Sequence, residues 1–145
     1  MRKELIYPAP DTKMVQMARN FIDYIIKNPN DCFKEMATLN IMTGKNFSPN
    51  DFLEFKNYFN LRDLAELAVL PTAPKVNDLT KDEVTMLLNN IYKYIKNGDN
   101  LKATYYIELL ETSFNKVGEI SAYVFQPLNM GKVQPIVDYL FNSVV

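Results

Sequence analysis

The sequence predicts an all-α protein, folded as a single compact bundle of six or seven helices. Three observations carry this prediction. Apolar residues recur at spacings of three and four along most of the 145-residue chain, as they do on the buried face of a helix. Residues that cap helices precede several of these segments. Proline and glycine, which interrupt helices, fall between the segments.

The first third of the chain predicts two helices. Asp11 is a candidate N-cap for a helix over residues 12–27, whose apolar side chains share one face. Asn28 and Pro29 are expected to end this helix and to start a second, weaker one, which Gly44 closes. The apolar positions expected for this second helix are Phe33, Met36, Ala37 and Ile41.

Two further helices are predicted before the middle of the chain. Ser48 and Pro49 supply a cap and a first helical residue for one, and a short helix over residues 61–70 follows. Residues 71–74 read Pro-Thr-Ala-Pro, which no helix interior accommodates. We therefore expect one domain over residues 1–145, with residues 71–79 as the place for a subdomain joint.

The second half predicts an antiparallel helical hairpin over about residues 80–115. Thr80 and Glu83 form a capping box, and the helix that they start is expected to run to residue 96. Residues 97–98, Asn-Gly, stop that helix, and a second helix follows over residues 101–114. Residues 119–126 are rich in strand formers, so a small strand and the extension of a helix are both open there.

A last amphipathic helix is predicted to begin at Pro135. Its apolar positions are Ile136, Val137, Leu140, Phe141 and Val144.

Composition lowers the expectation for several classes of function. The chain has 16 basic and 17 acidic residues, so it lacks the basic surplus typical of nucleic-acid binders. It has no histidine, which excludes imidazole-based catalytic triads and histidine zinc sites. A single cysteine permits no intrachain disulfide and suits a reducing cytoplasm. No apolar run approaches the length of a membrane span, and no signal peptide is recognised.

The remaining candidates for chemistry have structural interpretations that we favour. Gly44 and Lys45 lack the other residues of a phosphate-binding loop, so we expect a helix end. Cys32 has apolar neighbours and no histidine to activate it, so we expect an inert thiol. Three carboxylate pairs are expected to be solvated or to cap helices, namely Asp63 with Glu66, Asp82 with Glu83, and Glu108 with Glu111. We expect no catalytic residue, metal or cofactor.

The helix over residues 101–114 is apolar on nearly all sides, which indicates a helix that is central in the core or covered by a partner. Its second apolar stripe consists of Leu101, Tyr105 and Leu109. Tyr92 and Tyr94 of the preceding helix could extend that stripe. The central-helix interpretation is favoured, and the alternative is a surface that binds a protein partner or a second copy of the chain.

The functional prediction is therefore a non-enzymatic helical module that binds a protein, as an adaptor, a regulator or an inhibitor or immunity-type protein does. One alternative is a nucleic-acid-associated regulator, because Lys93, Lys96 and Lys102 lie around the tyrosines of the hairpin. Another is a small enzyme that relies on lysine, tyrosine or carboxylate groups.

Overall fold

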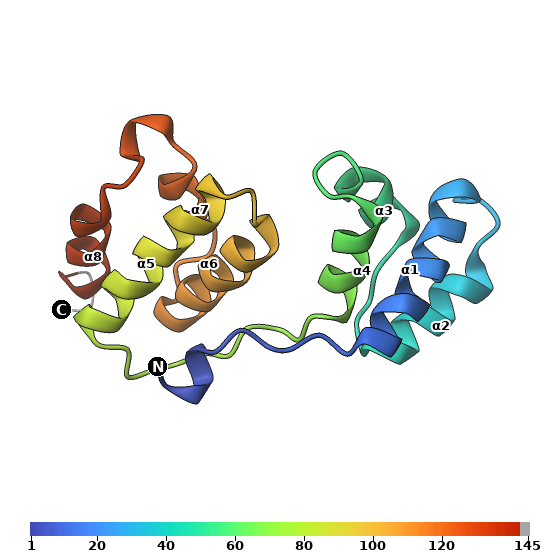
Figure 1. Ribbon diagram of the computed structural model, residues 1–145, viewed down its shortest axis with the longest axis horizontal. Helices are drawn as coiled ribbons and strands as arrows, with labels where there is room; N and C mark the ends of the chain where they lie inside the picture. Colours follow the sequence, from blue (N-terminus) through green and yellow to red (C-terminus); the bar gives the residue numbers. More distant parts are fainter. Residues whose placement is uncertain (143–145) are drawn as a thin grey trace. The chain divides into compact units, whose positions relative to one another are not determined.

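The chain is helical throughout, and the all-α prediction is confirmed. The computed structural model describes residues 1–142, and within this range it has eight α-helices, two short 3₁₀ helices and no strand (Figure 1). The number of helices exceeds the expected six or seven partly because residues 119–126 contribute α7 (Glu119–Val124) rather than a strand. A strand at residues 119–126 would need a second strand to pair with, and the described residues contain none.

The described residues group into two compact units, and the chain passes from one to the other twice. Pro8–Pro71 form the first, which we call the N-terminal unit. The second, the C-terminal unit, combines Met1–Tyr7 with the chain from Thr72 onward. The boundary at Pro71 lies at the start of the joint predicted over residues 71–79, whereas the grouping of the first seven residues with the second half was not predicted.

The N-terminal unit is built around one helix. It contains α1 (Thr12–Lys27), α2 (Phe33–Thr43), α3 (Pro49–Phe55) and α4 (Leu61–Val69). Helix α1 packs against the other three, most extensively against α4, whereas α2 packs chiefly on α1 (Figure 1). The core between them includes Ala18, Ile22, Ile25, Leu39, Phe52 and Leu64.

The start of α2 differs from the prediction. Asn28 does not cap this helix, because its side-chain amide donates to the Tyr24 carbonyl (3.0 Å) and closes the end of α1. A turn over residues 28–31 follows, and α2 begins at Phe33 with Cys32 as its N-cap residue. Asn28 thus satisfies a carbonyl of the helix that it ends rather than an N–H group of the next one.

The C-terminal unit contains η1 (Lys3–Leu5), α5 (Lys81–Lys96), α6 (Asn100–Phe114), α7, η2 (Pro127–Asn129) and α8 (Val133–Asn142). Helices α5 and α6 form the predicted hairpin, and α5 lies between α6 and α8 (Figure 1). Helix α8 begins at Val133, two residues before the predicted start at Pro135. The predicted apolar position Val144 lies outside the described residues.

Capping explains where α1 and α5 begin. The Asp11 carboxylate accepts from the Lys13 and Met14 N–H groups (3.0 and 3.1 Å), as predicted. The Thr80 hydroxyl accepts from the Glu83 N–H (3.1 Å), and the Glu83 carboxylate accepts from the Thr80 N–H (3.0 Å). These bonds satisfy N–H groups that the first turn of each helix leaves without an intrahelical partner.

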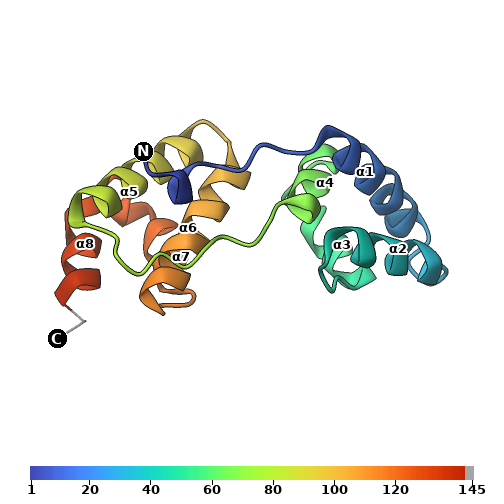
Figure 2. The same ribbon diagram turned by 90° about the horizontal axis from the view of Figure 1, so that it is seen from below.

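Residues 1–7 are an integral part of the C-terminal unit (Figure 2). The Leu5 side chain is fully buried, and the Leu5 carbonyl accepts from the Tyr106 hydroxyl (2.8 Å). Arg2 forms ion pairs with Asp78 (3.0 Å) and Glu83 (2.8 Å). A buried leucine and two ion pairs therefore hold this segment against the start of α5 and the middle of α6.

Candidate functional site

The predicted stripe on α6 lies inside the C-terminal unit. Leu101, Tyr105 and Leu109 are all buried, and seven of the fifteen residues of α6 are buried in total. A buried side chain offers no area to a partner, so the structure supports the central-helix alternative and not a binding stripe on α6. We therefore do not retain these three residues as a partner-binding site.

The two tyrosines that were expected to extend the stripe are also engaged within the unit. Tyr92 is buried, and its hydroxyl donates to the Asn129 carbonyl (2.9 Å). Tyr94 is half-buried, and its ring stacks on that of Tyr106 at 6.0 Å between centroids. Burial raises the pKa of Tyr106 to about 12, with smaller contributions from Tyr94 and Tyr105.

The lysine nearest these rings is also engaged. The Lys102 ammonium lies 5.7 Å from the centroid of the Tyr7 ring and 5.8 Å from that of Tyr94. It also pairs with Asp99 at 3.8 Å. Of the three lysines in the nucleic-acid alternative, Lys102 is thus in contact with these rings, whereas Lys93 and Lys96 are exposed.

The outer face of α2 is the most exposed apolar helix face in the described residues. Phe33 is 89% exposed and Ile41 is 83% exposed, and Ala37 lies between them. Because residues four apart share one side of a helix, the three side chains form a row about 12 Å long. We call Phe33, Ala37 and Ile41 the α2 surface.

The sequence carries a signal for this surface, which the apolar pattern of a single amphipathic face does not explain. Helix α2 carries apolar residues on its outer as well as its inner side, since Met36 and Leu39 are buried while Phe33 and Ile41 are exposed. A helix that is apolar all round is either central or covered by a partner. Residues 101–114 share this feature and are central, whereas Phe33 and Ile41 lie outside the core.

A second exposed apolar group lies in the turn that follows α7. Phe125, Leu128 and Met130 are 56%, 83% and 55% exposed. Two hydrogen bonds hold this turn in place. The Tyr92 hydroxyl donates to the Asn129 carbonyl, and the Asn129 amide donates to the Tyr123 carbonyl (3.1 Å). Unlike the residues of the α2 surface, its side chains belong to no common helix face.

The other candidates for chemistry have structural roles. Gly44 ends α2 with a φ of 68°, and the Lys45 ammonium donates to the Leu67 and Leu70 carbonyls at the end of α4. The Glu111 carboxylate accepts from the Ser121 N–H (3.0 Å) in the first turn of α7. In the described part of the chain no three acidic or cysteine side chains are grouped as metal ligands.

Cys32 is buried, and its thiol lies 3.5 Å from the Pro29 carbonyl. Burial raises the pKa of the Cys32 thiol, and the neighbouring carboxylates of Glu35 and Asp31 raise it further. A raised pKa lowers the thiolate fraction at neutral pH, in agreement with the expectation of an inert thiol.

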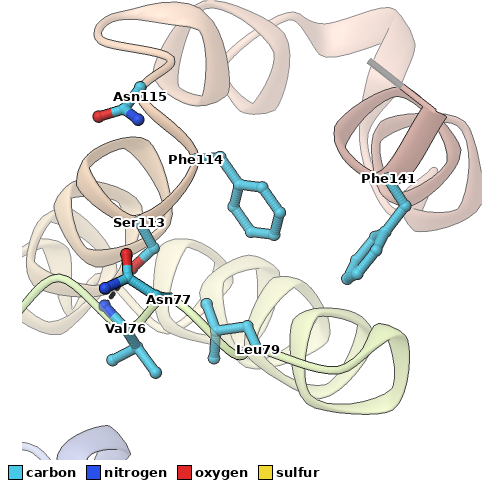
Figure 3. A pocket seen from close by; sticks show the side chains of 7 residues that line it. All are labelled: Val76, Asn77, Leu79, Ser113, Phe114, Asn115 and Phe141. Atoms are coloured by element: carbon cyan, nitrogen blue, oxygen red, sulfur yellow. Dashed lines mark hydrogen bonds between the residues drawn. The ribbon is translucent and has the colours of Figure 1, made fainter. Parts of the chain in front are cut away.

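The C-terminal unit also has a pocket of about 350 Å³ at the end of α6 (Figure 3). Its polar wall consists of Asn77, Ser113 and Asn115, and its apolar wall of Val76, Leu79, Phe114 and Phe141. The Phe114 and Phe141 rings meet edge to face at 5.4 Å between centroids. None of the seven described residues that line this pocket has an ionisable side chain, so they offer no general acid or base.

Comparisons with protein-family models, with curated proteins and with solved structures gave no match. Among the described residues no helix is both long and apolar enough to cross a membrane.

Proposed function

We propose that the chain is a non-enzymatic, helical protein-interaction module that binds its partner through the α2 surface. The observation that carries this proposal is the exposure of Phe33 (89%) and Ile41 (83%) on one side of a single helix. Large apolar side chains at interface centres supply most of the binding energy of many complexes. Here the helix holds two of them at a fixed backbone spacing, so little backbone ordering is needed on binding.

The dimensions of α2 favour a partner that surrounds the helix. A helix of 11 residues is about 16 Å long, which is short for the roughly 800 Å² per partner that a stable interface buries. If the partner were a second copy of the chain, its α2 packed against this one would cover only part of that area. A partner protein with an apolar groove would also cover the flanks of the helix, as in other complexes in which a helix inserts into a groove.

The charge on these flanks indicates the rim of such a groove. Lys34 is exposed, and it forms no ion pair within the described part of the chain. Position 34 lies between Phe33 and Thr38 on the outer side of α2, so a carboxylate on the partner's rim would meet it. The proposed partner is therefore a protein with an apolar groove that has an acidic edge.

The test is photo-crosslinking in the cell that produces the protein. Benzoylphenylalanine introduced at Phe33 or at Ile41 is expected to give the same protein adduct, whereas the matched exposed site Val117 (87% exposed) is expected to give none. An adduct with a second copy of the chain identifies self-association. Equal adducts from all three sites, or none from positions 33 and 41, would refute the proposal.

A double substitution separates binding from folding. Phe33→Ser with Ile41→Ser should abolish the adduct formed from benzoylphenylalanine at Lys34, while the urea midpoint stays close to that of the wild type, because exposed substitutions change stability by about 0.5 kcal/mol or less. Val117→Ser is the matched control and should preserve both. Loss of cooperative unfolding in the double variant would mean that these residues belong to the core.

A further inference from the structure

We propose that the pocket at the end of α6 is a binding site for a neutral aromatic ring that carries a carbonyl acceptor, such as an aromatic carboxamide. The pocket lies wholly in the C-terminal unit, and its lining includes no residue of the α2 surface. This inference is therefore independent of the proposed function. It rests on the preformed walls of the pocket, on its lack of charge and on the balance of its donors and acceptors.

The walls are fixed before any ligand arrives. The segment before α5 is anchored by Val76 and Leu79, which are 6% and 7% exposed. The Val76 N–H donates to the Ser113 hydroxyl (2.9 Å), and the Lys75 ammonium donates to the Asn115 side-chain carbonyl (3.2 Å). These bonds tie residues 75–79 to the end of α6, so a ligand would meet a largely preformed site.

The apolar wall suits an aromatic ring. Figure 3 shows the Phe114 and Phe141 rings on one side of the pocket, with Asn77 and Ser113 together on the other side and Leu79 below. Rings at this separation present both edges and faces, so a third ring can join them in an edge-to-face or offset arrangement. The volume of about 350 Å³ lies at the small end of the range for ligand pockets, which favours a compound with one ring.

The absence of charge on the lining favours a neutral ligand. A charged group that enters the pocket loses its water and gains no opposite charge among the seven lining residues. Two lysines that contact lining residues are engaged in interactions of their own. The Lys81 ammonium lies 5.8 Å from the centroid of the Phe141 ring, and Lys75 is bound to Asn115.

The polar wall has more donors than acceptors to offer. Ser113 uses its oxygen to accept from Val76, and its hydroxyl proton has no acceptor among the described residues. Asn115 uses its carbonyl to accept from Lys75, which leaves its amide donors available. The Asn77 amide has no hydrogen-bond partner in the described part of the chain, so it supplies two donors and one acceptor. A carbonyl oxygen on the ligand complements this set.

The test is a titration of the full chain, followed by ¹⁵N–¹H correlation spectra, with probes of equal shape and different charge. Benzamide should shift the amide signals of Asn77 and of residues 113–115 in a saturable way, with a dissociation constant on the order of 1 mM, as expected for a ligand of this size. Benzoate and benzylamine should bind at least about tenfold more weakly. Cyclohexanecarboxamide should bind about threefold more weakly, because it lacks the aromatic ring.

A pair of variants locates the site. Asn77→Ala removes an exposed side chain, so the fold should persist, and the affinity for benzamide should fall about fivefold. Asn89→Ala, at an exposed position of α5 away from the pocket, is the matched control and should leave the affinity unchanged. The proposal is overturned if benzamide shifts no signal saturably, if benzoate or benzylamine binds as tightly, or if the shifts lie outside residues 75–79 and 113–115. None of these outcomes bears on crosslinking at Phe33.

Discussion

At the scale of single residues, burial decides what each chemically interesting side chain does. Tyrosine is common at protein interfaces, yet Tyr105 and Tyr106 lie within the core, at 3% exposure each. Phe33 has the residue type of a core but lies outside it. Composition restricted the kinds of chemistry that the chain can perform, whereas only packing assigns each aromatic side chain to the inside or the outside.

Cys32 provides a direct test of this reasoning. Its raised pKa, caused first by burial and then by Glu35 and Asp31, lowers the thiolate fraction, and its 4% exposure limits access. We expect the folded chain to react with a disulfide reagent at pH 8 at least about a hundredfold more slowly than the urea-unfolded chain, since a local opening of about 3 kcal/mol is needed.

The double variant Asp31→Asn with Glu35→Gln should modestly increase the rate of this reaction, because it removes the two charges that raise the pKa. Lys34→Gln is the control, because Lys34 lies between Asp31 and Glu35 in the sequence and does not raise the pKa of Cys32. Equal rates for folded and unfolded wild-type chains would show that the thiol is accessible.

At the scale of elements, local motifs predicted helix boundaries well wherever a side chain could cap only one helix. Asp11 and Thr80 cap nothing but the helices that follow them, and α1 and α5 have the predicted ends. Asn28 could cap either the end of α1 or the start of α2. Its side chain bonds to a carbonyl at the end of α1, and α2 begins at Phe33 instead. The inward or outward position of α2 and α6 depends on neighbours far away in the sequence, so the repeating pattern of either helix could not decide it.

The capping box of α5 predicts a dependence on pH. The Thr80 N–H, first, and the Arg2 guanidinium lower the pKa of Glu83 below its usual value of 4.5. A carboxylate with a lowered pKa stabilises the fold above its unfolded-state pKa, and this stabilisation is lost as the pH falls through the folded-state pKa.

Glu83→Gln should therefore lower the melting temperature at pH 7, and the difference from the wild type should shrink progressively below about pH 4.5, as the wild-type carboxyl also becomes neutral. Thermal melts between pH 3 and pH 7 measure this. Asp82→Asn, which removes a neighbouring charge outside the capping box, should show a smaller effect at pH 7. A difference for Glu83→Gln that stays constant across the range would contradict the assignment.

At the scale of the whole molecule, the sequence indicated the joint near residue 71 but not the route of the chain. Helical periodicity describes faces, and residues 1–7 contain only the short η1, so no pattern related them to α6. The bond between the Tyr106 hydroxyl and the Leu5 carbonyl spans 101 positions of sequence. Contacts over such distances follow from complementary packing and not from local spacing.

The segment allows a prediction with an adjacent control. Leu5→Ala should destabilise the C-terminal unit by about 2–5 kcal/mol, because it leaves a cavity where a fully buried leucine packs. Ile6→Ala, at a position that is 56% exposed, should change stability by about 0.5 kcal/mol or less. Urea unfolding gives the magnitudes.

Hydrogen exchange shows where the effect lies. Protection in the Leu5→Ala variant should fall in α5 and α6 and stay unchanged in α1 and α4, because Leu5 belongs to the C-terminal unit. Equal effects of the two substitutions, or a loss of protection confined to residues 8–71, would contradict the role given to residues 1–7.

The docking of residues 1–7 also determines when the C-terminal unit can complete its folding during synthesis. A ribosome releases these residues before residues 8–71, yet the groups that receive them, from Asp78 to Tyr106, emerge later. The C-terminal unit must therefore close by a long-range step after α6 has been translated, a kind of contact that slows folding. Until then the Leu5 side chain lacks the surroundings that bury it in the folded unit, so this apolar group stays exposed to solvent for part of synthesis.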